Sequence, residues 1–345
     1  MEKPLFYIGI DIAATTFTSS IGCADSHWHI IGRPETFENI FDSFAKFSGW
    51  LRDHGVKANN SVACMEATGV YSEVLAHFLV SNGYILAIEP PLKVKRAFKP
   101  AGHKSDPVDS QQIAEYAYRF WDELSRWVPR EEILEQIKTL LTTREQFVTQ
   151  KTGHHNALKA LEYKHVHTPL AEKVQKTAIA ELKTHIKEIE NEIERLIGQD
   201  PDLRNLAALL ISVPGVGLLL AAHLLVIIQS APEPCTAKNL AAYIGICPYE
   251  NSSGSSGWHT PTSRHYGPRT LRKLIFLAAM SNSTHNPQFK LYAMRKAQEG
   301  KPKKVVVNNI ANKLLKVIVA VVRTNTEFIP GYRSVNPSLL NLALT

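Results

Sequence analysis

The stretch Phe-Tyr-Ile-Gly-Ile-Asp at residues 6–11 is an apolar run that ends in an acid. Further short apolar runs follow it after polar breaks, and each predicts a β-strand. Apolar residues at helical spacing lie between and after these runs and predict helices. Strands are expected at 6–11, 16–21, 28–31, 61–65 and 84–88, and helices at 37–51, 70–80 and 106–120. Strands mixed with helices in this order predict an α/β sheet domain over residues 1–128.

The pattern changes after Pro129, where the chain becomes helical and rich in charge. Two long helices are expected at 133–163 and 170–197. In the second, apolar residues recur at alternating steps of four and three, as in a coiled-coil seam. These residues are Leu182, Ile186, Ile189, Ile193 and Leu196. We therefore expect a helical coiled-coil hairpin over 129–202, although an ordinary amphipathic helix is an equally good interpretation.

Residues 203–345 predict a third, mainly α-helical domain. Its most apolar stretch, Leu209 to Ile228, is interrupted by Pro214, Gly215 and Gly217, which favours a buried helical hairpin over a membrane span. The N-terminus lacks the basic start and long apolar run of a signal peptide. These features predict a cytoplasmic protein without a membrane partner.

The overall balance of charge is basic, with a formal net charge of +7 and a pI of about 9.1. Such a balance suits a polyanionic partner, either nucleic acid or an anionic membrane surface. An apolar fraction of 44% argues against wholesale disorder. The four cysteines are scattered, with no C-x-x-C pair and no zinc-ligand spacing, and predict reduced, mostly buried thiols.

Four acids stand out by their places in the predicted elements. Asp11 and Glu66 each end a strand, and Asp106 and Asp109 lie three residues apart at the start of a helix, on one face. Taken singly, each has an ordinary structural interpretation, such as a turn cap or a helix N-cap. Taken together, acids at strand ends and on a helix packed against the sheet are expected to meet at one point.

Carboxylates that share a small volume need a counter-charge. Mg²⁺ or Mn²⁺ supplies it, because hard cations prefer oxygen ligands. Two such ions about 3.5 to 4 Å apart activate a nucleophile and stabilise a leaving oxygen in phosphoryl transfer. The four acids therefore predict a magnesium or manganese site.

At these residues the chain resembles a known family. Tyr-Ile-Gly-Ile-Asp (7–11), Met-Glu-Ala-Thr-Gly-Val-Tyr (65–71) and Lys-Ser-Asp-Pro-Val-Asp (104–109) are similar to the N-terminal motifs of the DEDD insertion-sequence transposases. That family resembles Piv-type DNA invertases and includes bridge-RNA-guided recombinases. The resemblance implies an RNase H-like, RuvC-like N-terminal fold. It also implies that Asp11, Glu66, Asp106 and Asp109 are the catalytic metal ligands.

The C-terminal half resembles the transposase domain of the same family. The matching segments are Ser-Val-Pro-Gly-Val-Gly (212–217), Leu-Ala-Ala-Tyr-Ile-Gly-Ile-Cys-Pro (240–248), Ser-Gly-Ser-Ser (253–256) and Tyr266-Gly267 with Arg269, Leu271 and Arg272. The resemblance spans nearly the whole chain. One departure follows Asp11, where many relatives carry a lysine and this chain has Ala13, Ala14 and Thr15. A helper cation is therefore expected to be missing there.

By resemblance, Ser253 is the catalytic serine, with the neighbouring serines of 252–256 as alternatives. A serine in a flexible glycine-rich loop can reach a phosphodiester and form a phosphoserine link, which allows rejoining without ATP. Serine is a poor nucleophile at neutral pH and needs a base or metal nearby. Without the resemblance, a Ser/Gly/Asn cluster indicates only a loop. Val-Pro-Gly-Val-Gly (213–217) resembles a helix-hairpin-helix phosphate-binding turn, or is a tight turn between buried helices.

Two basic stretches flank the expected chemistry and predict phosphate contacts. Between Trp258 and Lys304 there are ten Lys or Arg residues and one acid. Solvated surface is the alternative interpretation of both stretches. The nucleic-acid-binding candidates are Lys93, Lys95, Arg96, Lys99, Lys104, Arg264, Arg269, Arg272 and Lys273.

The sequence thus predicts a transposase, a site-specific DNA recombinase of a bacterial or archaeal insertion sequence. Double-stranded DNA is its expected substrate. Strand exchange needs several active sites, so a dimer or tetramer is expected. The resemblance implies a structured guide RNA as partner. Two alternatives remain open. A RuvC-like nuclease or Holliday-junction resolvase would use the acids and water, and a non-catalytic nucleic-acid-binding protein would need none of the acids.

Overall fold

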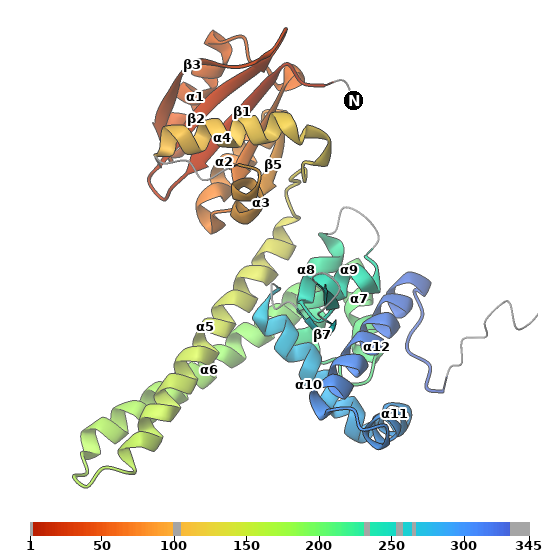
Figure 1. Cartoon of the computed structure of the whole chain (residues 1–345). Coiled ribbons are helices and arrows are strands. Elements are labelled where there is room, and N and C mark those ends of the chain that lie inside the picture. Colours follow the sequence, from red (N-terminus) through yellow and green to blue (C-terminus); the bar gives the residue numbers. More distant parts are fainter. Residues whose placement is uncertain (1–2, 99–104, 231–234, 253–257, 264–266, 332–345) are drawn as a thin grey trace, which may run out of the picture. The chain divides into compact units, whose positions relative to one another are not determined.

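The computed structural model describes residues 3–98, 105–230, 235–252, 258–263 and 267–331. Contacts between Cα atoms divide the chain into two compact units, Met1–Pro129 and Arg130–Thr345 (Figure 1). The first unit is a sheet with helices on both faces, and the second is mainly helical. Each unit is described by itself below.

A five-stranded sheet with the order β3-β2-β1-β4-β5 forms the centre of the first unit. Strands β1, β2 and β3 pair antiparallel, whereas β4 runs parallel to β1 and β5 parallel to β4. The strands are β1 (Phe6–Ile12), β2 (Thr16–Ala24), β3 (Trp28–Glu38), β4 (Ser61–Glu66) and β5 (Ile85–Glu89). This arrangement is the RNase H-like fold, so the predicted fold class is confirmed.

Helices cover both faces of this sheet, which explains why β1 and β4 are apolar on both sides. Helices α1 (Phe41–Asp53) and α2 (Glu73–Ser81) pack on one face around Phe17, Phe44 and Phe47. Helix α4 (Asp106–Arg119) lies across the other face (Figure 1), where Tyr7 and Tyr116 are buried. The short helices are η1 (Ala58–Asn60), η2 (Gly69–Ser72), α3 (Pro91–Arg96) and η3 (Trp121–Glu123).

The structure corrects the predicted boundary between the third strand and the first helix. Strand β3 continues to Glu38, so Phe37 is not helical. Phe37 pairs with Phe17 across the strands, and the two rings stack with their centroids 5.3 Å apart. This cross-strand contact buries Phe37 and overrides its helical spacing, so α1 begins at Phe41. The helix expected from Val70 begins as η2 and becomes α-helical only at Glu73.

The second unit begins with two long helices, α5 (Glu132–Leu161) and α6 (Pro169–Gln199), which lie side by side (Figure 1). The predicted seam residues Ile186, Ile193 and Leu196 are buried. Beyond the seam, Tyr163 and Leu170 are exposed, and residues 142–185 include no side chain that is buried by the described part of the chain. The helical hairpin is observed, and a coiled-coil pairing stays a prediction.

The described residues of the second unit form six further helices. They are α7 (Pro201–Ser212), α8 (Leu218–Gln229), α9 (Ala237–Ile244), α10 (Arg269–His285), α11 (Pro287–Gln298) and α12 (Lys303–Thr324). Leu209 to Ile228 forms the predicted buried hairpin of α7 and α8. By length and composition α12 would be able to cross a membrane, but Ile310, Leu314 and Ile318 lie in the core shared with α7, α8 and α10.

The Val-Pro-Gly-Val-Gly segment is a tight turn between α7 and α8. Gly215 has a φ of +82°, a conformation that favours glycine. The buried Asn282 of α10 donates a hydrogen bond from Nδ2 to the Pro214 carbonyl at 2.6 Å. One side of the turn is therefore packed against α10, as in the alternative interpretation of this segment.

The mainly helical prediction missed a two-stranded antiparallel sheet of β6 (Pro248–Ser252) and β7 (Trp258–Ser263). Residues 253–257 connect these strands and lie outside the described residues, as do 264–266.

Candidate active site

The register of two parallel strands brings Asp11 and Glu66 to one edge of the sheet. Ile10 of β1 lies opposite Met65 of β4, and each acid is the next residue along the same strand. Because β1 and β4 run in the same direction, both acids lie at the carboxyl ends of neighbouring strands. Both side chains are half-buried.

A close approach of α4 to β1 brings the other two acids to this edge. A Cβ atom on Gly9 would lie 2.1 Å from the Ser110 carbonyl oxygen and 2.3 Å from the Ala114 amide nitrogen. Only glycine therefore allows the helix backbone to pack here. A buried hydrogen bond of 2.6 Å between the Ser20 and Ser110 hydroxyls fixes the same crossing. Asp109 and the exposed Asp106 lie in the first turn of this helix.

One pocket of about 390 Å³ gathers all four acids predicted from the sequence. Its lining is largely polar, and α3 contributes one cation to it, Lys95. The lining residues are Asp11, Glu66, Val94, Lys95, Ser105, Asp106, Asp109 and Gln112. The structure thus brings the four acids together around one space, and their metal-binding and catalytic roles stay predictions.

The donor set of the pocket suits a hard divalent cation. Four carboxylates, one hydroxyl and one amide supply oxygen atoms, the ligands that Mg²⁺ and Mn²⁺ prefer. Among the described residues that line the pocket, Lys95 is the one basic residue beside four acids. The carboxylates that line the pocket thus outnumber its lysine, and a bound divalent cation would offset negative charge there.

Lys95 supplies a positive charge to the pocket of this chain, which lacks a lysine after Asp11. Relatives were expected to carry a helper cation on the β1–β2 turn, where this chain has Ala13, Ala14 and Thr15. Here a lysine reaches the same pocket from α3 instead. From the sequence, Lys95 is predicted only to bind nucleic acid. Its position beside the acids depends on how α3 packs in the fold.

A fifth acid, Glu89, ends β5 opposite Glu66 but serves a structural role. It is fully buried, accepts a hydrogen bond of 2.8 Å from the Ser125 amide and forms an ion pair of 3.0 Å with Lys93. The same carboxylate raises the pKa of the Lys93 ammonium, against an opposing effect of burial. This ion pair explains the positive charge at Lys93 without a contact to a DNA phosphate.

The remaining cations of the first basic stretch fall into two groups. Arg96 is exposed on α3 and is free to reach a phosphate in solvent. Lys99 and Lys104 lie outside the described residues. Lys95 and Arg96 are therefore the described cations of this stretch that remain as nucleic-acid candidates.

The second basic stretch begins at the N-terminus of α10. Arg269 and Lys273 are exposed in its first turns, where the helix dipole favours an anion. Arg272 instead donates a hydrogen bond of 3.2 Å to the Ile244 carbonyl at the end of α9. A Cβ on Gly267 would meet the Tyr243 carbonyl oxygen at 1.9 Å, so glycine lets this segment pack against α9. Ser253 and Arg264 lie outside the described residues.

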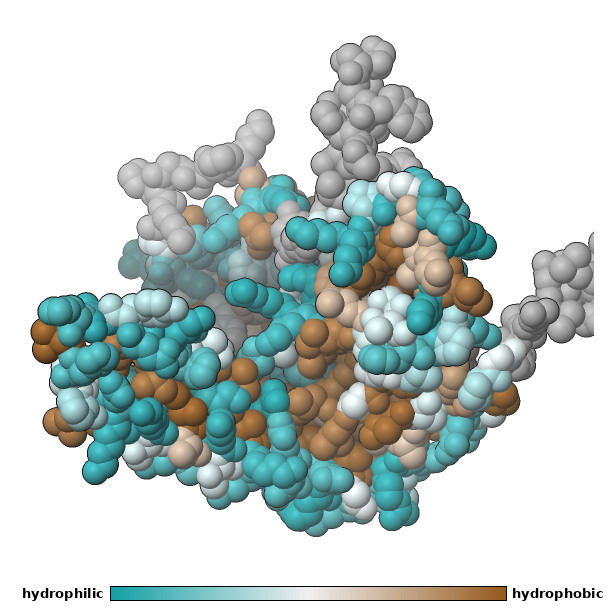
Figure 2. All heavy atoms as spheres, turned by 90° about the horizontal axis from the view of Figure 1, so that it is seen from below, coloured by the Kyte–Doolittle hydropathy of each residue, from teal (hydrophilic) through white to brown (hydrophobic). Residues whose placement is uncertain are grey.

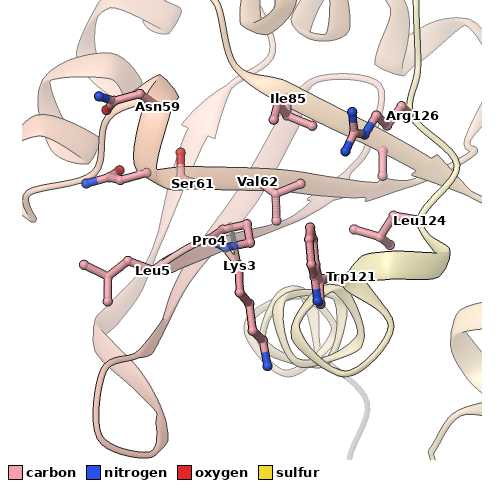
Figure 3. Close-up of a pocket in the computed structure, with 12 residues that line it drawn as sticks. Lys3, Pro4, Leu5, Asn59, Ser61, Val62, Ile85, Trp121, Leu124 and Arg126 are labelled. Carbon is pink, nitrogen blue, oxygen red and sulfur yellow. The ribbon is translucent and has the colours of Figure 1, made fainter. Parts of the chain in front are cut away.

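A second pocket of about 370 Å³ opens at the other end of the same strands (Figure 3). It borders Leu5, before β1, and Ser61, at the start of β4. Trp121 forms one wall, and the Arg126 guanidinium lies on the side of β5. None of the residues that line it is an acid. It therefore offers no carboxylate ligands, and the predicted metal site stays with the pocket of the four acids.

Two family models match most of the chain. One, described as a transposase of the DEDD IS110 type, matches residues 8–161. The other, described as the transposase IS116/IS110/IS902 family, matches residues 207–293. The first contains the four acids, and the second contains β6, β7 and the start of α10.

Two of the relatives align along nearly the whole chain, and a third aligns along less than half of it. The pilin gene-inverting protein of Moraxella bovis is 30% identical over 325 residues, 93% of this chain and 97% of that protein. The protein of the same name from Moraxella lacunata is 30% identical over 327 residues, with the same coverage. An uncharacterized 43.6 kDa protein of insertion element IS110 from Streptomyces coelicolor is 31% identical over 153 residues, 44% of this chain and 37% of that protein.

Among solved structures, RuvC of Thermus thermophilus matches 35% of this chain and 98% of its own, with 13% identity and a TM-score of 0.27. The strand order β3-β2-β1-β4-β5 and the strand directions by themselves define the RNase H-like fold of the first unit.

Proposed function

The chain belongs to the IS116/IS110/IS902 family of transposases and is a DNA recombinase, and we propose that it uses a carboxylate-bound metal and a serine nucleophile. The observation that carries this proposal is the single pocket lined by Asp11, Glu66, Asp106 and Asp109. These acids would hold Mg²⁺ or Mn²⁺. When bound, the metal would lower the pKa of an attacking hydroxyl and stabilise the charge on a leaving oxygen.

The protein's own residues would prepare the site before DNA arrives. Gly9 and the Ser20–Ser110 hydrogen bond hold the first turn of α4 against β1, which fixes the acids on α4 near those on the strands. Such preorganisation is worth much in phosphoryl transfer, where catalysis depends mainly on positioning and electrostatic stabilisation. Lys95 would contact a phosphate oxygen at the border of the pocket.

The proposed nucleophile is Ser253, by its match to the family's serine loop. Its Oγ would attack a DNA phosphorus, forming an O–P bond while the bond from phosphorus to one DNA oxygen breaks. The released DNA oxygen takes up a proton, and the serine gives one up. In the second step a DNA hydroxyl attacks the phosphoserine and restores the serine, so the number of phosphodiester bonds is conserved without ATP.

Nucleic-acid partners are proposed from charge and from the family. Arg269 and Lys273 present exposed positive charge at a helix N-terminus, which suits a DNA phosphate. A structured guide RNA is proposed from the family resemblance alone. A homo-oligomer is proposed because strand exchange needs several active sites. Figure 2 shows apolar side chains that interrupt the hydrophilic surface, as an oligomer would require. Leu170 and Val174 of α6 are among the exposed apolar residues.

The chemistry is tested by trapping the covalent intermediate. The full chain is incubated with Mg²⁺ and element-end DNA carrying a nick that prevents rejoining, together with any RNA transcribed from the element's flanks. Peptide mapping of the adduct is expected to place the DNA on Ser253, and Ser253→Ala is expected to abolish it. DNA cutting by Ser253→Ala at the wild-type rate would instead assign a RuvC-like nuclease that uses water.

A further inference from the structure

The turn between β2 and β3 gathers three metal-ligating side chains far from the acid pocket. Cys23 of β2 lies directly opposite His29 of β3 in the antiparallel register, so both side chains are on the same face of the sheet. Asp25 follows Cys23 by two residues, in the turn itself. One ligand atom from each residue can be chosen such that the three lie within 4.8 Å of one another.

The local contacts already orient these groups. His29 Nδ1 lies 3.8 Å from Asp25 Oδ1 and 3.1 Å from the His27 carbonyl oxygen. The Ser26 amide donates a hydrogen bond of 2.5 Å to Asp25 Oδ1. The exposed Asp25 carboxylate thus lies within reach of the buried Cys23 thiol and the His29 ring.

We propose that Cys23, Asp25 and His29 form a binding site for a divalent metal of the zinc class. Zn²⁺ and Co²⁺ accept a thiolate sulfur, an imidazole nitrogen and a carboxylate oxygen in one site, whereas Mg²⁺ prefers oxygen ligands alone. Tetrahedral bonds of about 2.0–2.3 Å place ligand atoms roughly 3.3–3.8 Å apart, so small side-chain rotations close the cluster. The Cys23 proton goes to solvent when the thiolate binds the metal.

This site is separate from the pocket of the four acids. Asp11 pairs with Thr18 on β2, whereas Cys23 lies five residues further along that strand. At about 3.4 Å per residue, the two positions are roughly 17 Å apart along β2. The proposed site has three protein ligands, which leaves a fourth tetrahedral position to water. Its first effect would be to cross-link β2 to β3 beside the turn that joins them.

The proposal is tested with Co²⁺ as a spectroscopic probe, added to the full reduced chain in excess Mg²⁺. A thiolate ligand gives a near-ultraviolet sulfur-to-cobalt charge-transfer band, which a carboxylate site cannot produce. We expect this band at one Co²⁺ per chain, and displacement of the Co²⁺ by Zn²⁺. No band in the wild-type chain would overturn the proposal.

Variants assign the ligands. Cys23→Ser is expected to abolish the band, and Asp25→Asn and His29→Gln to weaken Co²⁺ binding on the order of tenfold or more. Asp25 is exposed and His29 half-buried, so these two variants remain informative if Cys23→Ser fails to fold. Cys235→Ser is the matched thiol control and is expected to keep the band, as is Asp11→Ala. Loss of the band in Cys235→Ser, or wild-type binding in both Asp25→Asn and His29→Gln, would refute the assignment.

Discussion

A single methyl group on Gly9 tests how the site is assembled. In Gly9→Ala the new Cβ would lie 2.1 Å from the Ser110 carbonyl oxygen, a backbone atom of α4. Normal contact distances would then require α4 to move away from β1 by about 1 Å or more. The backbone of Gly9 has no positive φ, so the cost is steric and not conformational.

The expected magnitudes follow from that displacement. Overpacking a close contact costs about 1–3 kcal/mol in the free energy of unfolding, beyond the small gain from replacing glycine in the unfolded chain. Asp106 and Asp109 move with α4, and a displacement of about 1 Å in a catalytic group can lower the rate about 100-fold. The variant is therefore expected to lose recombination while still being folded.

Urea unfolding and recombination are measured on the same full-length variants. Four of the five tryptophans lie in the first unit, so tryptophan fluorescence follows mainly its unfolding. Gly153→Ala is the matched control, because its Cβ would meet no atom within 4 Å and it lies inside α5. That control is expected to be neutral or more stable by about 1 kcal/mol. Wild-type stability and recombination in Gly9→Ala would refute the close packing of α4 on β1.

Three further expectations concern charge. Lys93→Met removes the ion pair of the buried Glu89 carboxylate and should cost about 1–3 kcal/mol in urea unfolding, since Lys93 itself is partly exposed. Lys95→Met should keep stability and weaken DNA binding. Equal stability of the two variants would contradict this. Burial lowers the pKa of His223 to about 4, below its usual 6.5. Between these two pKa values the unfolded state binds more protons than the folded state, so stability should fall as the pH drops from about 6.5 to 4. Unfolding measured across this pH range should show a smaller fall for His223→Gln. Arg269→Ala and Lys273→Ala should each reduce the salt slope of DNA binding by about 1 in filter-binding titrations, and an unchanged slope would remove that residue from the DNA interface.

The acids could be predicted from the sequence because strand ends and helix starts are local features. An apolar run ending in an acid defines Asp11 and Glu66, and a three-residue spacing defines Asp106 and Asp109. Their gathering around one pocket also needs the strand order and the contact at Gly9, and for this the family resemblance was the stronger guide.

What the sequence did not predict depends on contacts between segments distant along the chain. Phe37 has helical spacing but is held in β3 by Phe17 across the strands. Lys93 and Lys95 look alike in a basic stretch, and only the buried Glu89 separates their roles. The spacing of the cysteines along the sequence indicates no zinc site. Cys23 lies beside His29 only through the pairing of β2 with β3, which residue spacing does not predict.

Recombination in cells measures whether the pocket of four acids performs the DNA chemistry. The chain is supplied with its native flanking DNA and a target plasmid, and new junctions are sequenced. Asp11→Asn is compared with Asp122→Asn, an exposed acid of the same unit that does not line the pocket. We expect junctions from the wild type and Asp122→Asn and none from Asp11→Asn. Junctions at the wild-type frequency from Asp11→Asn would contradict the claim.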